Sequence, residues 1–269
     1  MHERTRPKPP AFTRWILILT LLVLYVPLAT MVLSSFSEGA IGVSAFTLRW
    51  YGQVFQDPVL WNALGRSLIV AGGSALGATL LGLLGALALN KWVFVGKWPL
   101  QALSLLSLML PELVLALSLL SWYALVGLEL SLATVILAHI TLTLPFVILV
   151  IGARLKGLEP AYEDAARDLG AREWEVLLKV ILPLLKPAIA TAFLLAFLLS
   201  FDDFLVTFYT NGAGSDTLPV RLYSLMKTGL TPKIQALSSL MLLASVALIV
   251  VLVKTTSLRS HREQGAKAP

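Results

Sequence analysis

The sequence predicts an all-α membrane protein with six transmembrane helices. Of its 269 residues, 57% are hydrophobic and only 13% are charged, and the mean hydropathy is +0.83. Soluble domains carry roughly 25% charged residues, about twice this share. The composition therefore excludes a disordered chain, a nucleic-acid-binding domain and most cytosolic enzymes.

Six apolar stretches are long enough to cross a bilayer, which takes about 20 residues. They cover approximately residues 15–34, 64–90, 100–126, 132–152, 187–206 and 234–253. The first follows a basic tail, as a signal peptide would, but its apolar run exceeds the roughly 7–15 residues typical of such peptides, and no A-x-A-like site follows promptly. We therefore expect an uncleaved helix, a membrane domain over residues 15–253, and tails at 1–14 and 254–269.

The distribution of Lys and Arg predicts that both termini face the cytoplasm. Six spans place the two termini on the same side of the membrane, and sixteen of the 21 basic residues then lie on that side. Because cytoplasmic segments of membrane proteins are enriched in Lys and Arg, the net charge of +6 is a topology signal. No nucleic-acid partner is needed to explain it.

The second span contains small residues at intervals of four, namely Gly73-x-x-x-Gly77 and Ala78-x-x-x-Gly82. Small residues at this spacing let two helix backbones approach closely within a membrane. We expect a tight helix–helix contact along this face, either within the chain or with a partner.

Between the fourth and fifth spans lies a polar stretch, residues 154–186, which we call the charged segment. From Glu159 to Lys179, nine of 21 residues are charged. Apolar residues recur there every three to four positions, which predicts amphipathic helices, with a break at Gly170. Between Glu159 and Lys179, acidic residues outnumber basic ones six to three, so this stretch suits a groove on another protein better than anionic lipid headgroups.

One long, gapped motif lies in the charged segment. Asp164-Ala165-Ala166 is followed after three residues by Gly170, and after nine more by Val180-Ile181-Leu182-Pro183. This run resembles the E-A-A, G, I-x-L-P signature of permease subunits of ATP-binding-cassette (ABC) importers, with Asp164 in place of Glu and Val180 in place of Ile. The resemblance implies a cytoplasmic coupling helix that docks on the ATPase subunit through Glu163, Asp164, Ala165, Ala166, Gly170, Leu182 and Pro183.

Two further stretches, residues 198–209 (LLSFDDFLVTFY) and 217–237, look like the shorter permease subunit of spermidine/putrescine importers. The resemblance implies the type I importer permease fold, polyamine uptake and a place in the bacterial inner membrane. The implied partners are a second permease, two nucleotide-binding ATPase subunits and an extracytoplasmic substrate-binding protein. No P-loop motif is present, so we expect a transport subunit that is not an enzyme and holds no cofactor, with ATP and Mg²⁺ on the partner ATPase.

Acidic residues at membrane depth are costly and are usually functional. Glu112 lies in the third span, and Asp202 and Asp203 end the fifth. Carboxylates and aromatic faces are the groups that bind a chain of ammonium ions. The predicted substrate path therefore consists of Glu112, Asp202, Asp203, Trp50 and Phe201.

Several alternatives remain open for these residues. Adjacent aspartates point to different sides of a helix, so we expect one to face the cavity and the other to cap a helix or to pair with Arg221 or Arg66. Trp50 also suits the membrane interface. We expect His139, in the fourth span, to be a hydrogen-bonded packing residue.

Two alternative functions are weighed against polyamine uptake. The same machinery could import another small solute. A membrane enzyme could use Asp202 and Asp203 to hold Mg²⁺, but that chemistry requires a second acidic cluster, which the sequence lacks. With no Cys and three separated His residues, the sequence predicts no metal site.

Overall fold

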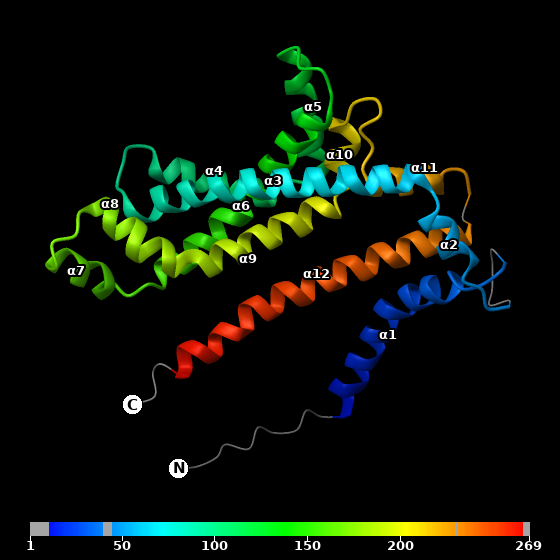
Figure 1. Cartoon of the computed structure of the whole chain (residues 1–269), viewed down its shortest axis with the longest axis horizontal. Coiled ribbons are helices and arrows are strands. Elements are labelled where there is room, and N and C mark those ends of the chain that lie inside the picture. The colour runs from blue at the N-terminus through cyan, green and yellow to red at the C-terminus, as the bar shows by residue number, and fades with distance from the viewer. Residues whose placement is uncertain (1–10, 40–44, 230, 266–269) are drawn as a thin grey trace. The chain divides into compact units, whose positions relative to one another are not determined.

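The structure, a computed structural model, describes residues 11–39, 45–229 and 231–265, and this part of the chain is almost entirely helical (Figure 1). Its strand-like pairing consists of an isolated bridge between Ser37 and Phe46. The elements in chain order are α1 (Ala11–Ser34), α2 (Arg49–Phe55), α3 (Pro58–Lys91), α4 (Lys97–Met109), α5 (Glu112–Leu125), α6 (Leu132–Lys156), α7 (Ala161–Asp168), α8 (Glu173–Glu175), the π-helix η1 (Val176–Ile181), α9 (Leu182–Phe201), α10 (Leu205–Thr210), α11 (Leu218–Met226) and α12 (Pro232–Gly265).

Five helices in the described part are long and apolar enough to cross a membrane, namely α1, α3, α6, the continuous helix from Glu173 to Phe201, and α12. A sixth, α5, is apolar but shorter. The all-helical architecture expected from the sequence is confirmed. Of the predicted tails, residues 1–10 and 266–269 lie outside the described residues, and α12 extends into the second tail as far as Gly265.

The stretch predicted as a single third span, residues 100–126, consists of two helices in the structure. Leu110 has extended backbone (ψ 134°), and Pro111 precedes the first residue of α5. Proline disfavours helical backbone in the residue before it and lacks the N–H that a continuous helix requires. The break at Pro111 places Glu112 in the first turn of a new helix.

The chain divides into two compact units, residues 1–57 with 224–242 and residues 58–223 with 243–269. In the described part of the smaller unit, the region between α1 and α2 is held by aromatic and hydroxyl contacts. The rings of Phe36 and Phe46 stack at 5.4 Å, and the Ser35 and Tyr51 hydroxyls are 2.7 Å apart. The Lys233 ammonium lies 2.8 Å from the Asp57 carboxylate, which joins the start of α12 to the end of α2.

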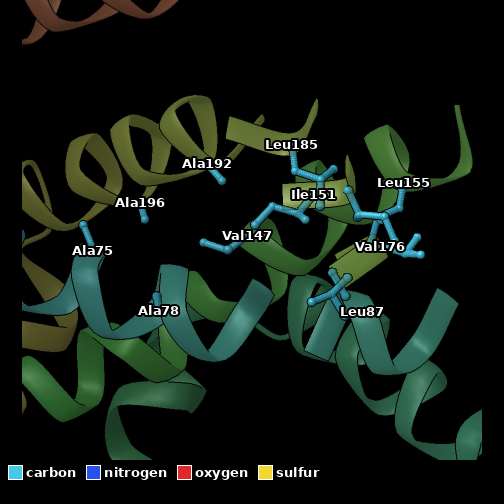
Figure 2. Packing of buried hydrophobic residues seen from close by; sticks show 12 residues of the cluster. Ala75, Ala78, Leu87, Val147, Ile151, Leu155, Val176, Leu185, Ala192 and Ala196 are labelled. Atoms are coloured by element: carbon cyan, nitrogen blue, oxygen red, sulfur yellow. The ribbon is translucent and has the colours of Figure 1, made fainter. Parts of the chain in front are cut away.

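The core of the larger unit lies where α3, α6 and α9 pack together (Figure 1). Figure 2 shows how small residues of α3 and α9, such as Ala75, Ala78, Ala192 and Ala196, lie beside larger side chains of α6. Interdigitation of small and large residues allows close backbone packing where lipid provides no hydrophobic drive between helices. The helices α3, α6 and α9 thereby form a fixed frame for the polar groups described below.

The tight contact predicted for the second span is found within the chain, between α3 and α6. A Cβ atom added to Gly77 would lie 2.5 Å from Ile140 Cδ1, and one added to Gly82 would lie 2.8 Å from Val147 Cβ. At Gly77 a new side chain would displace the end of Ile140, and at Gly82 the Val147 Cβ next to the α6 backbone leaves no room for one. The small-residue pattern therefore sets the distance between α3 and α6.

Candidate functional site: an acidic cavity and a charged segment

A cavity of about 620 Å³ lies in the larger unit where α4, α5, α6, α9 and α10 come together. Three carboxylates, those of Glu112, Asp202 and Asp203, line it together with leucines and the rings of Phe146 and Phe204. Among the described residues, no lysine or arginine lines this cavity. We call it the acidic cavity.

Asp202 and Asp203 lie at a break between two helices, α9 and α10. The sequence predicts this fifth apolar stretch as one continuous span over 187–206. Helix α9 ends at Phe201, and the Asp203 carboxylate accepts hydrogen bonds from the backbone N–H groups of Val206 (3.3 Å) and Thr207 (2.9 Å) in the first turn of α10. A carboxylate that accepts from free N–H groups is a favourable start for a helix. Asp203 thus fills the capping role considered for one of the two acids.

Asp203 is buried, and its carboxylate has further partners besides the two N–H groups of α10. Its Oδ2 atom accepts the Thr207 hydroxyl at 3.1 Å and lies 3.1 Å from His139 Nε2. The Glu112 carboxyl is also hydrogen-bonded to Asp203. A charged group in such a place is stable only with compensating partners.

Asp202 differs from its neighbour because it is exposed and projects from the end of α9. Its Oδ1 accepts the Ser245 hydroxyl of α12 at 2.7 Å. The sequence analysis considered Arg221 or Arg66 as a partner for one of the two acids. In the structure the partner of Asp202 is Ser245, and that of Asp203 is His139. Asp202 therefore remains the acid with capacity for a further cationic partner.

The aromatic residues predicted for the substrate path lie in different surroundings. Phe201 is buried, stacks on Phe197 with ring centroids 6.1 Å apart, and does not line the acidic cavity. Trp50 lies on α2 in the smaller unit, where its indole N–H donates to the Ser37 carbonyl at 2.9 Å. The structure places Phe204 in the cavity wall instead, with its ring tilted against that of Tyr223 and the two centroids 4.6 Å apart.

The charged segment forms two helical pieces joined at Gly170, as expected. Gly170 has φ +83°, a left-handed conformation that favours glycine. Its N–H donates to the Arg167 carbonyl at 2.8 Å, and the Ala171 N–H donates to the Ala166 carbonyl at 3.1 Å. These two bonds form a Schellman motif, which ends α7 and sets the direction of the chain into α8.

Ion pairs join α7 to α3 and span the Gly170 turn. The Lys91 ammonium, at the last residue of α3, bonds the Glu163 carboxylate. The Arg167 guanidinium donates to Glu173 at 2.7 Å and to Asp164 at 3.1 Å. The hydrogen bond from Arg167 to Glu173 raises the pKa of Arg167 above its ordinary value, so this side chain is always cationic.

The remaining predicted coupling residues lie on different faces of the charged segment. Ala166 packs against the core, whereas Ala165 is exposed. Leu182 and Pro183 form the first turn of α9, directly after η1. Large apolar side chains are also exposed on the segment, at Tyr162, Leu169, Trp174 and Leu178.

The sequence analysis assigns no role to Lys91, Ser200 or Thr207, each of which bonds a predicted residue or His139. It also assigns none to Ser74, which bonds Ser200. The polarity of Ser74 and Ser200 within apolar stretches was the available signal. Their contacts depend on which helices pack together, and residues 74 and 200 are 126 positions apart in the chain.

Membrane-length helices around a charged cavity, with an exposed segment rich in ion pairs, are the architecture of a multi-pass membrane transport subunit. Comparison with known proteins agrees with this class. Residues 78–261 match the family described as binding-protein-dependent transport system inner membrane component, and the chain belongs to that family.

Two relatives illustrate the similarity in sequence. The spermidine/putrescine transport system permease protein PotC of Haemophilus influenzae is 38% identical over 240 residues, which cover 88% of this chain and 93% of that protein. The putrescine transport system permease protein PotI of Escherichia coli strain K12 is 33% identical over 236 residues, which cover 84% of each chain.

Solved structures agree in fold. A bacterial ABC transporter involved in the import of the acidic polysaccharide alginate has a TM-score of 0.67 at 17% identity, with 93% of this chain and 99% of that chain covered. An amino acid ABC transporter with histidines has a TM-score of 0.62 at 18% identity, covering 81% and 100%. The expected type I importer permease fold is confirmed.

Proposed function

We propose that the chain is a permease subunit that carries polyamines through the membrane, and that the acidic cavity is part of their path. The observation that carries the proposal is the convergence of Glu112, Asp202 and Asp203 on one cavity. The names of the two relatives, PotC and PotI, agree with this substrate class.

The chemistry of the cavity suits a flexible chain of ammonium groups. An ammonium ion leaving water requires a compensating negative charge, and the attraction is much stronger in the low-dielectric interior than in water. Phe204, which lines the cavity and packs against Tyr223, offers an aromatic face for a cation. Flexible amines of different length can use the same carboxylates, so much of the selection falls to the substrate-binding protein.

The charged segment is proposed as the docking site for a separate ATPase subunit, with ATP and Mg²⁺ bound there and none in this chain. Tyr162, Leu169 and Trp174 are exposed apolar side chains on a segment otherwise rich in charge. Exposed apolar residues surrounded by polar ones are typical of a protein interface. The Lys91–Glu163 ion pair would transmit a displacement of α7 to α3.

The complete importer would contain a second permease, two ATPase subunits and an extracytoplasmic substrate-binding protein. The excess of Lys and Arg supports cytoplasmic termini, with the charged segment on the same side. ATP binding would close the ATPase pair and favour one of two permease conformations. Docking must be stronger in that conformation, because equal binding to both shifts no population.

Neutralising Asp202 tests the substrate path. Asp202→Asn removes one carboxylate charge from the cavity while keeping the side-chain size, and we expect the KM for spermidine uptake to rise about tenfold, as for loss of a bond to a charged group. The measurement is uptake of labelled putrescine and spermidine by a polyamine-auxotrophic bacterium expressing the whole complex.

Glu129→Gln provides the matched control, because Glu129 is an exposed carboxylate that does not line the acidic cavity. Its KM should equal that of the wild type. Absence of uptake of either amine by an assembled wild-type complex that hydrolyses ATP would overturn the polyamine assignment and point to another small solute. An unchanged KM in Asp202→Asn would remove this carboxylate from the path.

A further inference from the structure

His139 is a fully buried titratable side chain that bonds an acid of the proposed path. It lies in α6, with its ring inserted between the end of α9 and the start of α10. Nδ1 is 2.6 Å from Ser200 Oγ, and Nε2 is 2.9 Å from Thr207 Oγ1. The expectation of a hydrogen-bonded His139 is confirmed. The surrounding groups also determine which atom donates and which accepts in each of these bonds.

The Nε2 atom of His139 must carry a hydrogen. Thr207 has one hydroxyl hydrogen, which it donates to Asp203 Oδ2, so toward His139 its oxygen can only accept. Nε2 also lies 3.1 Å from Asp203 Oδ2. An unprotonated Nε2 would place its lone pair against a carboxylate oxygen, which is repulsive.

On the other side of the ring, Nδ1 accepts a hydrogen bond. The Ser74 hydroxyl of α3 has two acceptors in reach, Ser200 Oγ at 2.9 Å and the Ala71 carbonyl at 3.3 Å. Donation to the nearer Ser200 leaves the Ser200 hydrogen for Nδ1. A chain of hydrogen bonds therefore runs in one direction, from Ser74 through Ser200 and His139 to Asp203. It joins α3, α9 and α6 to the helix start that Asp203 caps.

We propose that His139 is a positioning residue for substrate binding, an inference that rests on the proposed function. By holding the Asp203 side chain, which is 1% exposed, inside the protein, His139 fixes the bend between α9 and α10. Asp202 projects from that bend toward the acidic cavity. The role of His139 is to decide which of the two adjacent acids meets the substrate.

Two amide replacements of His139 separate this role from simple packing. The glutamine amide nitrogen reaches the position of Nε2 and can donate to Asp203, whereas the shorter asparagine reaches only the position of Nδ1. His139→Asn should raise the KM for spermidine uptake about tenfold, while His139→Gln stays within about threefold of the wild type. Thr141→Val, on an exposed position of the same helix, is the control and should leave the KM unchanged.

The results distinguish failure of this inference from failure of the proposed function. If the wild-type complex imports polyamines but His139→Asn and His139→Gln have the same KM, or lower only the maximal rate, the positioning role is wrong. If the wild-type complex imports neither amine, the proposed function is wrong. The contact between His139 and Asp203 can then still be tested by a measurement that needs no transported solute.

That second test measures thermal unfolding of the purified complex. His139→Asn should lower the Tm by roughly 2–4 °C, and by clearly less when Asp203→Asn is already present, since the two residues then share no charged bond. Equal losses in both backgrounds would overturn the inference that His139 acts through Asp203.

Discussion

Replacing Gly170 with proline is expected to abolish ATP-driven uptake while leaving the subunit inserted in the membrane. Gly170 has φ +83°, and proline is restricted to φ near −65°. Proline would also lack the N–H that donates to the Arg167 carbonyl. The Schellman turn would be lost, and with it the presentation of Leu169 and Trp174 to the proposed ATPase partner. The measurement is uptake in membrane vesicles, normalised to the amount of inserted subunit.

The same segment provides the controls for Gly170→Pro. Gly157 ends α6 with φ −89°, and an added Cβ would lie 3.6 Å from the Arg154 carbonyl oxygen, an ordinary contact. Gly157→Ala should therefore retain uptake, and Gly170→Asn should retain part of it, because asparagine tolerates the left-handed region. Full uptake by Gly170→Pro would contradict the coupling role of this turn.

Adding one methyl group at Gly82 is expected to destabilise the membrane domain. The new Cβ would lie 2.8 Å from Val147 Cβ, so α3 and α6 would have to separate. Overpacking of this kind costs about 1–3 kcal/mol. The predicted result for Gly82→Ala is a lower Tm of the purified complex and less subunit in the membrane fraction.

Gly72→Ala is the matched control because it makes the same change within the same helix. No atom lies within 4 Å of a Cβ built at Gly72 in the described part of the chain. Alanine is also the better helix former, by about 1 kcal/mol, so Gly72→Ala should keep or raise the Tm. Equal loss of stability in both variants would contradict the assignment of Gly82 to the α3–α6 contact.

Features that depend on local pattern could be predicted from the sequence. Apolar length predicted the long helices α1, α3, α6 and α12, and Gly170 marked the break in the charged segment. The small residues Gly73, Gly77, Ala78 and Gly82, at intervals of four, indicated a close helix pair. Each of these signals lies within one segment of chain. The helical architecture and the turn at Gly170 follow from them directly.

Features that depend on partners far apart in sequence could not be predicted in this way. His139 bonds Ser200 and Thr207 from another helix, and the pairing of Lys91 with Glu163 spans 72 positions. The break after Phe201 was missed because the apolar run continues past it, while the Asp203 carboxylate begins a new helix. Hydropathy reports the polarity of a stretch, but it does not show which side chains form hydrogen bonds with the backbone N–H and C=O groups of that stretch.

The central claim is that this chain moves a cationic solute by coupling to ATP hydrolysed on another subunit. Its most direct test is uptake of labelled putrescine into proteoliposomes that contain the whole complex, with the substrate-binding protein on the opposite face from the charged segment and ATP on the same side as that segment. The account predicts uptake that requires hydrolysable ATP and is lost in Gly170→Pro. Uptake at the same rate without ATP, driven by an ion gradient alone, would contradict it.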